Sequence, residues 1–105
     1  MKMNWRKKLE EAVKELLVYE PEKIILYGSA ARGELTDVSD IDLLIIKKTD
    51  KDMFDRIGEV LKLLRNNLLP IEPMVFTPEE FERMKTEKRL FAEVVLKEEK
   101  VIYGK

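Results

Sequence analysis

Two pairs of residues, separated by a turn and a loop, have the types and spacing to do chemistry. Gly28 and Ser29 follow one apolar run, and Asp40 and Asp42 open the next. A Gly-Ser pair that starts a helical turn offers backbone N–H groups and the positive end of a helix dipole, which suit a phosphate. Residues two apart on a strand share a face, so we expect both carboxylates to point the same way. Carboxylates beside a phosphate-binding corner suit a divalent metal and a nucleoside triphosphate.

The segments around these residues form one predicted strand-turn-strand unit. Residues 23–27 are predicted to be a strand, residues 29–32 a short helix, and Gly33 its left-handed stop. Residues 34–39 are a predicted loop. Residues 40–46 end in a continuous apolar run, which is typical of a strand covered on both faces in the middle of a sheet.

Two longer segments have the spacing of amphipathic helices. Residues 4–20 and residues 52–68 each carry apolar side chains three and four positions apart, with charged residues between them. The predicted stripes are Trp5, Leu9, Ala12, Val13, Leu16 and Leu17 in the first, and Met53, Ile57, Val60, Leu61, Leu64 and Leu68 in the second. We expect both stripes to pack on a sheet.

The second half of the chain adds a strand, a helix and a closing strand. Residues 71–76 are a predicted strand, and Pro73 predicts either an edge position or a local irregularity, because proline donates no ladder hydrogen bond. Thr77 begins a capping box that opens the next helix. A further helix is predicted through Leu90, Phe91, Val94 and Val95, and a short strand at residues 101–103.

These elements predict a single α/β (α+β) domain over residues 1–105. We expect a small mixed sheet flanked by helices, mainly on one side, with the strand at residues 40–46 in its centre. This strand should run antiparallel to the first strand and lie beside the third. The acidic cluster should lie at the open edge of the sheet.

Composition narrows the chemistry and the partners. The net charge is -1, from 20 basic and 21 acidic residues, so direct nucleic-acid binding is not expected. The chain has no cysteine and no histidine, which leaves carboxylates, hydroxyls, Lys or Arg to do any chemistry. No signal-peptide region or run of transmembrane length is present, which predicts a cytoplasmic protein without membrane contact.

The string GSAARGELTDVSDIDLLI resembles the signature of the DNA polymerase β-type nucleotidyltransferase superfamily. It is similar in particular to the minimal nucleotidyltransferases of prokaryotes, which are stand-alone catalytic domains. The strings PIEPMVFTPEEFERM and VIYG extend this resemblance over essentially the whole chain. The resemblance therefore implies a nucleotidyltransferase fold.

The resemblance also implies the roles of the site residues. Asp40, Asp42 and Glu72 would be the catalytic carboxylates that hold two Mg²⁺ ions, with Glu72 where the family more often has Asp. Glu72 could instead be a surface residue of an edge strand. Two metals can clamp the attacking and leaving oxygens of a displacement at phosphorus, which needs no histidine.

Three further residues would bind the triphosphate of ATP. Gly28 would allow close backbone approach, and Ser29 would contact phosphate while also capping the turn. Arg32 would neutralise phosphate charge, although a structural salt bridge with Asp37 or Asp40 is an equal alternative. Tyr19, Tyr27 and Tyr103 are interpreted as packing residues rather than groups that stack on adenine.

The resemblance predicts an enzyme that transfers AMP from ATP to a hydroxyl acceptor. That acceptor would be a tyrosine of an all-helical HEPN-domain toxin, which makes the chain an antitoxin. The alternative is a non-catalytic or weakly active binding module that neutralises a helical partner by occlusion, and the glutamate at position 72 motivates it. Transfer to RNA or to a small molecule such as an aminoglycoside is a third possibility, which the near-neutral charge and the lack of an added substrate domain disfavour.

Overall fold

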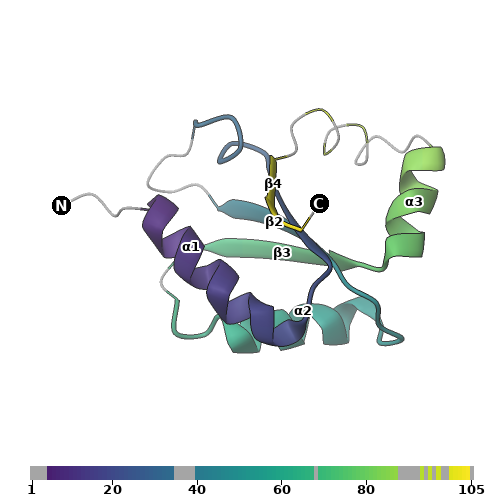
Figure 1. Ribbon diagram of the computed structural model, residues 1–105, viewed down its shortest axis with the longest axis horizontal. Helices are drawn as coiled ribbons and strands as arrows, with labels where there is room; N and C mark the ends of the chain where they lie inside the picture. Colours follow the sequence, from purple (N-terminus) through teal and green to yellow (C-terminus); the bar gives the residue numbers. More distant parts are fainter. Residues whose placement is uncertain are drawn as a thin grey trace.

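The computed structural model of this 105-residue chain describes residues 5–34, 40–67, 69–87, 93, 95, 97 and 100–104. The elements follow in the order α1 (Trp5–Leu16), a 3₁₀-helix η1 (Leu17–Tyr19), β1 (Lys23–Tyr27), β2 (Ile41–Ile46), α2 (Met53–Leu63), β3 (Ile71–Phe76), α3 (Pro78–Thr86) and β4 (Lys100–Tyr103) (Figure 1). The predicted mixture of helices and strands is confirmed.

Across the described residues, four strands form one mixed sheet in the order β3-β2-β1-β4. β2 pairs antiparallel with β1 and parallel with β3, while β4 pairs antiparallel with the other side of β1. The predicted central position of the second strand and both of its neighbours are confirmed. β3 is an edge strand, as Pro73 predicted.

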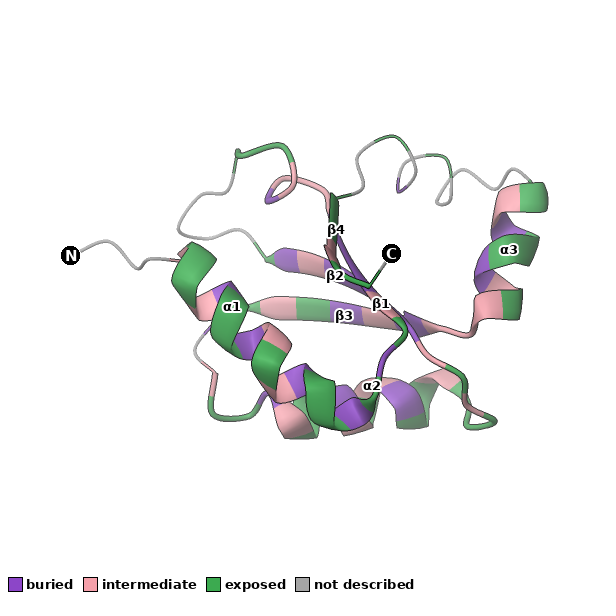
Figure 2. Cartoon of the chain, viewed as in Figure 1, coloured by how far each residue is buried: buried purple, intermediate pink, exposed green. Residues whose placement is uncertain are grey.

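Successive side chains of β2 enter two separate hydrophobic cores, one on each face of the sheet. Leu43 packs in the larger core, which side chains of α1 and α2 close. Leu44 packs in the smaller core on the opposite face, together with Phe81 of α3 and Val95. Figures 1 and 2 show α1 and α2 on the same side of the sheet, with buried stripes turned toward it. The continuous apolar run of β2 is thus explained by burial on both faces.

The buried side of α2 differs from the predicted stripe. Val60 is buried as expected, but Arg56 is also buried, whereas Leu61 is 48% exposed. Leu68, the last predicted member, lies outside the described residues. The helix is therefore rotated so that one predicted core residue faces outward and one charged residue faces inward.

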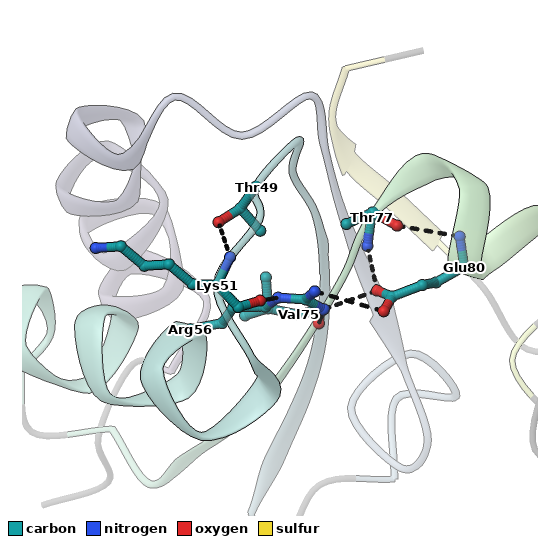
Figure 3. Close-up of polar contacts among 6 residues, drawn as sticks. All are labelled: Thr49, Lys51, Arg56, Val75, Thr77 and Glu80. Carbon is teal, nitrogen blue, oxygen red and sulfur yellow. Dashed lines mark hydrogen bonds and ion pairs between the residues drawn. The ribbon is translucent and has the colours of Figure 1, made fainter.

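Arg56 is accommodated because it bonds to three separate segments (Figure 3). Its Nε donates to the Lys51 carbonyl at 2.6 Å, and its Nη1 donates to the Val75 carbonyl at 3.2 Å and to Glu80 Oε1 at 2.7 Å. Glu80 also accepts the Thr77 N–H at 2.8 Å, and its own N–H donates to the Thr77 hydroxyl, which confirms the predicted capping box. This Arg56 network ties α2 to the edge strand and to the start of α3.

Several predicted boundaries are corrected. α1 ends at Leu16 and continues as η1, and α2 ends at Leu63, five residues before the predicted end. β2 begins at Ile41, so Asp40 precedes the strand. Most of the loop predicted at residues 34–39 and the predicted helix residues Leu90, Phe91 and Val94 lie outside the described residues. None of the helices in the described part of the chain is long and apolar enough to cross a membrane.

Candidate active site

The Gly-Ser corner is a tight turn rather than the predicted short helix. Gly28 has a φ of +74°, and its carbonyl accepts the N–H of Arg32 at 3.2 Å. The Ser29 carbonyl accepts the N–H of Glu34 at 2.8 Å, and Gly33 ends the turn with a φ of +75°, as predicted. The turn is no helix, but its bond from Arg32 to Gly28 spans four residues, as in the first turn of a helix. The first N–H groups of such a turn have no acceptor within it, so the corner retains the donors that suit an anion.

Two features require glycine at position 28, the left-handed backbone conformation and the carboxylate of Asp42. A Cβ atom placed on Gly28 would lie 2.5 Å from Oδ2 of Asp42. No real side chain tolerates that distance, so Asp42 lies directly against the turn. The predicted reason for this glycine was close approach of phosphate. The structure adds a second reason, because any larger residue would displace Asp42.

Three polar side chains lie in a row across three neighbouring strands. Asp42 is opposite Tyr27 in the antiparallel β1-β2 ladder, and it is opposite Glu72 in the parallel β2-β3 ladder. Tyr27 packs against the core on the α3 face of the sheet, which identifies the face that the row shares. Tyr27, Asp42 and Glu72 also line one hollow of about 500 Å³. The structure therefore brings together Asp42 and Glu72, which lie 30 positions apart in the sequence.

The electrostatics of this row favour a cation. Burial raises the pKa of Asp42, and the charge of Glu72, a hydrogen bond with Glu72 and the charge of Asp40 raise it further. The described side chains that line the hollow include these two acids and no basic residue. A carboxylate whose pKa is raised by neighbouring negative charge binds a proton or a metal ion more readily than an isolated carboxylate.

Asp40 contributes less directly than predicted. It is exposed and precedes β2, although its charge acts on Asp42. Within the described ranges, no three His, Cys, Asp or Glu side chains surround one point closely enough to hold a metal ion. The geometry fits a divalent ion held by Asp42 and Glu72, with oxygen ligands that Mg²⁺ accepts. Asp40 would have to turn inward to join them.

Arg32 forms an ion pair with Glu34, a residue that was not among its predicted partners. Its Nε donates to Glu34 Oε2 at 2.9 Å, and both side chains are substantially exposed. Asp37, one predicted partner, lies outside the described residues. An exposed pair of this kind contributes about 0 to 1 kcal/mol. Its role at phosphate stays a prediction.

Tyr27 is the site residue that sequence reasoning missed. It was interpreted as a packing residue, and it does pack against the core, but it also lines the hollow beside both acids. Burial, and then the charges of Asp42 and Glu72, raise its pKa to about 12. Its place directly before Gly28 was visible in the sequence. Its place opposite Asp42 depends on strand register, which was not.

Comparisons with known proteins agree with this geometry. Residues 6–103 match the family model described as "Nucleotidyltransferase domain". The chain is 41% identical over 81 residues, which are 77% of each protein, to "Putative protein adenylyltransferase MJ0604" of Methanocaldococcus jannaschii. It also matches a crystal structure described as that of "a putative nucleotidyltransferase from Sulfolobus solfataricus", with a TM-score of 0.65 and 26% identity. That match covers 94% of this chain and 79% of the other. Together with the Gly-Ser corner and its adjacent acids, these matches show that the chain belongs to the nucleotidyltransferase domain family.

Proposed function

We propose that this chain transfers AMP from ATP, with Mg²⁺, to a hydroxyl group of another protein. The observation that carries the proposal is the pairing of Asp42 with Glu72 directly beside the Gly28 turn. This arrangement puts two carboxylates that can bind a metal ion next to backbone donors that suit a triphosphate. The relative described as a "Putative protein adenylyltransferase" supports a protein as the acceptor.

Each residue of the site has a role in this reaction. Asp42 and Glu72 would hold Mg²⁺, and Asp40 would join them from the end of β2. When bound, the metal ions supply charge neutralisation at the phosphates and a lower pKa for the acceptor hydroxyl. Ser29 and the backbone of the Gly28 turn would bind the phosphates, and Arg32, on the same turn, would neutralise phosphate charge.

The reaction balances as a displacement at the α-phosphorus. The acceptor oxygen forms a bond to this phosphorus, the bond to the β-phosphate oxygen breaks, and pyrophosphate leaves. The proton of the acceptor hydroxyl passes to a carboxylate, for which Glu72 is suited because it is exposed at the edge strand. Binding and charge placement supply most of the catalysis in such reactions.

The proposed acceptor is a tyrosine of an all-helical HEPN-type toxin, and the chain would act as its antitoxin. The support is the resemblance of the sequence to minimal nucleotidyltransferases. A second candidate is an inactive binding module that blocks such a partner without modifying it. The observation that favours this candidate is the absence, among the described side chains, of three metal-binding groups around one point.

A transfer assay separates the two candidates. The chain is incubated with Mg²⁺, a HEPN-type partner and ATP labelled at the α-phosphate. We expect the partner to become labelled by the wild type and not by Asp42→Asn. Asp50→Asn, which changes an exposed acid outside the site, is the matched control and should label fully. Equal labelling by Asp42→Asn would contradict the proposed reaction, and binding of the partner without labelling by the wild type would support occlusion.

A further inference from the structure

One side of α2 carries apolar residues that the fold does not bury. Phe54 is 85% exposed, Leu61 is 48% exposed, and Ile57 lies between them, half-buried. Residues spaced by three and four positions share one side of a helix, so these three form a continuous stripe. We call Phe54, Ile57 and Leu61 the α2 stripe. Figure 2 shows exposed positions along the outer surface of α2.

The α2 stripe leads into the candidate active site. Ile57 and Leu61 line the same hollow of about 500 Å³ as Asp42 and Glu72. The hollow passes over the edge strand β3, where Pro73 forms part of its wall. Its lining is mainly apolar, and its acids belong to the site. A molecule seated on the α2 stripe would therefore reach the carboxylates without leaving this surface.

The edge of β3 is poorly suited to bind an added strand. The Phe76 carbonyl points toward β2, where it accepts the N–H of Lys47, and the alternation of a parallel ladder directs residues 71, 73 and 75 away from β2. Pro73 has no N–H to donate, and the Val75 carbonyl already accepts from Arg56. Both features leave β3 with fewer backbone groups that could pair with an added strand.

The outer side of α2 is better suited to another helix. Gly58 lies next to the α2 stripe, and a Cβ placed there would meet no atom within 4 Å beyond its chain neighbours and the backbone of its own helix. A glycine in the middle of a helix weakens that helix, but it also lets a second helix approach closely. An amphipathic helix with anchors three and four residues apart is a common occupant of such an apolar groove.

We infer that the α2 stripe and the adjoining hollow bind an amphipathic helix of the acceptor protein, which brings its hydroxyl to Asp42 and Glu72. This inference rests on the proposed transfer reaction and adds how the acceptor is recognised. The acceptor is favoured over a second copy of the chain because a copy seated on the stripe would cover the hollow. The acidic end of the hollow also favours a helix with a hydroxyl or basic group at that point.

The test compares two variants with the same substitutions on different surfaces. Phe54→Gln with Leu61→Gln alters the α2 stripe. Leu17→Gln with Val18→Gln is the matched control, because these residues of η1 are also apolar and are 40% and 75% exposed. All four positions are exposed, so both variants should fold, which circular dichroism checks.

The probe is a protein extract of the host cell, incubated with Mg²⁺ and ATP labelled at the α-phosphate. At limiting extract, we expect the α2-stripe variant to label protein acceptors at least about tenfold less than the wild type, as for loss of interface anchors. The control variant should label as the wild type does. Calorimetry should give the same affinity for Mg²⁺-ATP in the wild type, in the control variant and in Phe54→Gln alone, because none of these substitutions touches the turn or lines the hollow.

Other outcomes overturn the inference in distinguishable ways. Full labelling by the α2-stripe variant, or an equal loss in the control, removes the stripe from acceptor binding and leaves the transfer reaction intact. A wild-type dimer that the α2-stripe variant loses in light scattering assigns the surface to a second copy. A wild type that neither binds Mg²⁺-ATP nor labels protein overturns the proposed function, and this inference with it.

Discussion

Substitution of Gly28 by alanine separates backbone strain from displacement of the site. Gly28 and Gly33 belong to the same turn and have nearly equal φ values of +74° and +75°. An alanine in this left-handed region costs about 1 to 2 kcal/mol, so Gly28→Ala and Gly33→Ala should lose similar stability. A Cβ at Gly33 meets no atom within 4 Å, whereas one at Gly28 would lie 2.5 Å from Asp42 Oδ2. Only Gly28→Ala should therefore affect Asp42.

The expected loss of activity follows from this distance. Ordinary contact begins at 3.4 Å, so the Asp42 carboxylate must move by about 0.9 Å. A carboxylate at the end of a flexible side chain can move this far at little cost in stability. A misplacement of about 1 Å in a catalytic group can lower a rate by about 100-fold. We expect about this loss of AMP transfer for Gly28→Ala and nearly full transfer for Gly33→Ala.

Two measurements on the same preparations check this expectation. Urea unfolding compares the free energy of unfolding of the two variants, and transfer of labelled AMP compares their rates under conditions where both are folded. Wild-type transfer by Gly28→Ala would refute the contact between this turn and a catalytic Asp42. An equal loss of transfer in both variants would attribute the effect to backbone strain alone.

Three further perturbations test other contacts. Arg56→Leu removes a buried cation from Glu80 and should lower the free energy of unfolding by about 2 to 4 kcal/mol in urea titrations. Burial raises the pKa of Glu80, but its bonds to Arg56 and Thr77 outweigh this and lower it below 4.5, so this pair stabilises the fold above that value. The stabilisation should be lost as the pH falls through the lowered pKa, and Glu80→Gln should remove this part of the pH dependence of unfolding. Asp42→Asn should raise the melting temperature of the metal-free chain slightly at pH 7, because the raised pKa of Asp42 means that its ionised form destabilises the fold above that pKa. A lower melting temperature for Asp42→Asn would contradict the raised pKa of Asp42 and its causes, which are burial and then the neighbouring acids.

Local patterns predicted most of the fold. The apolar run of residues 41–46 predicted a central strand, because consecutive apolar side chains are typical of a strand that is covered on both faces. Pro73 predicted an edge strand, because proline has no N–H to donate to a neighbouring strand. Thr77 predicted its capping box for the same reason. The predicted end of α2 was five residues too late, and the predicted start of β2 was one residue too early. Tertiary contacts set such boundaries.

The features that local patterns could not predict depend on residues far apart in the sequence. Arg56 is buried because its partners at Val75 and Glu80 lie 19 and 24 positions away. Leu61 is exposed because the Arg56 side of α2 faces the sheet instead. In the site, Asp42 and Glu72 were expected to meet on the strength of a family resemblance, but the place of Tyr27 beside them needed the strand register.

The most direct test of the site is a crystal structure of the chain with Mn²⁺ and an ATP analogue that cannot be cleaved between the α- and β-phosphates. Mn²⁺ replaces Mg²⁺ at oxygen ligands, and its anomalous signal locates it without ambiguity. We expect this signal between Asp42 and Glu72, with the triphosphate on the Gly28 turn and Asp40 turned toward the metal. A metal bound away from Asp42 and Glu72, or an analogue bound away from this turn, would contradict the assignment of the active site.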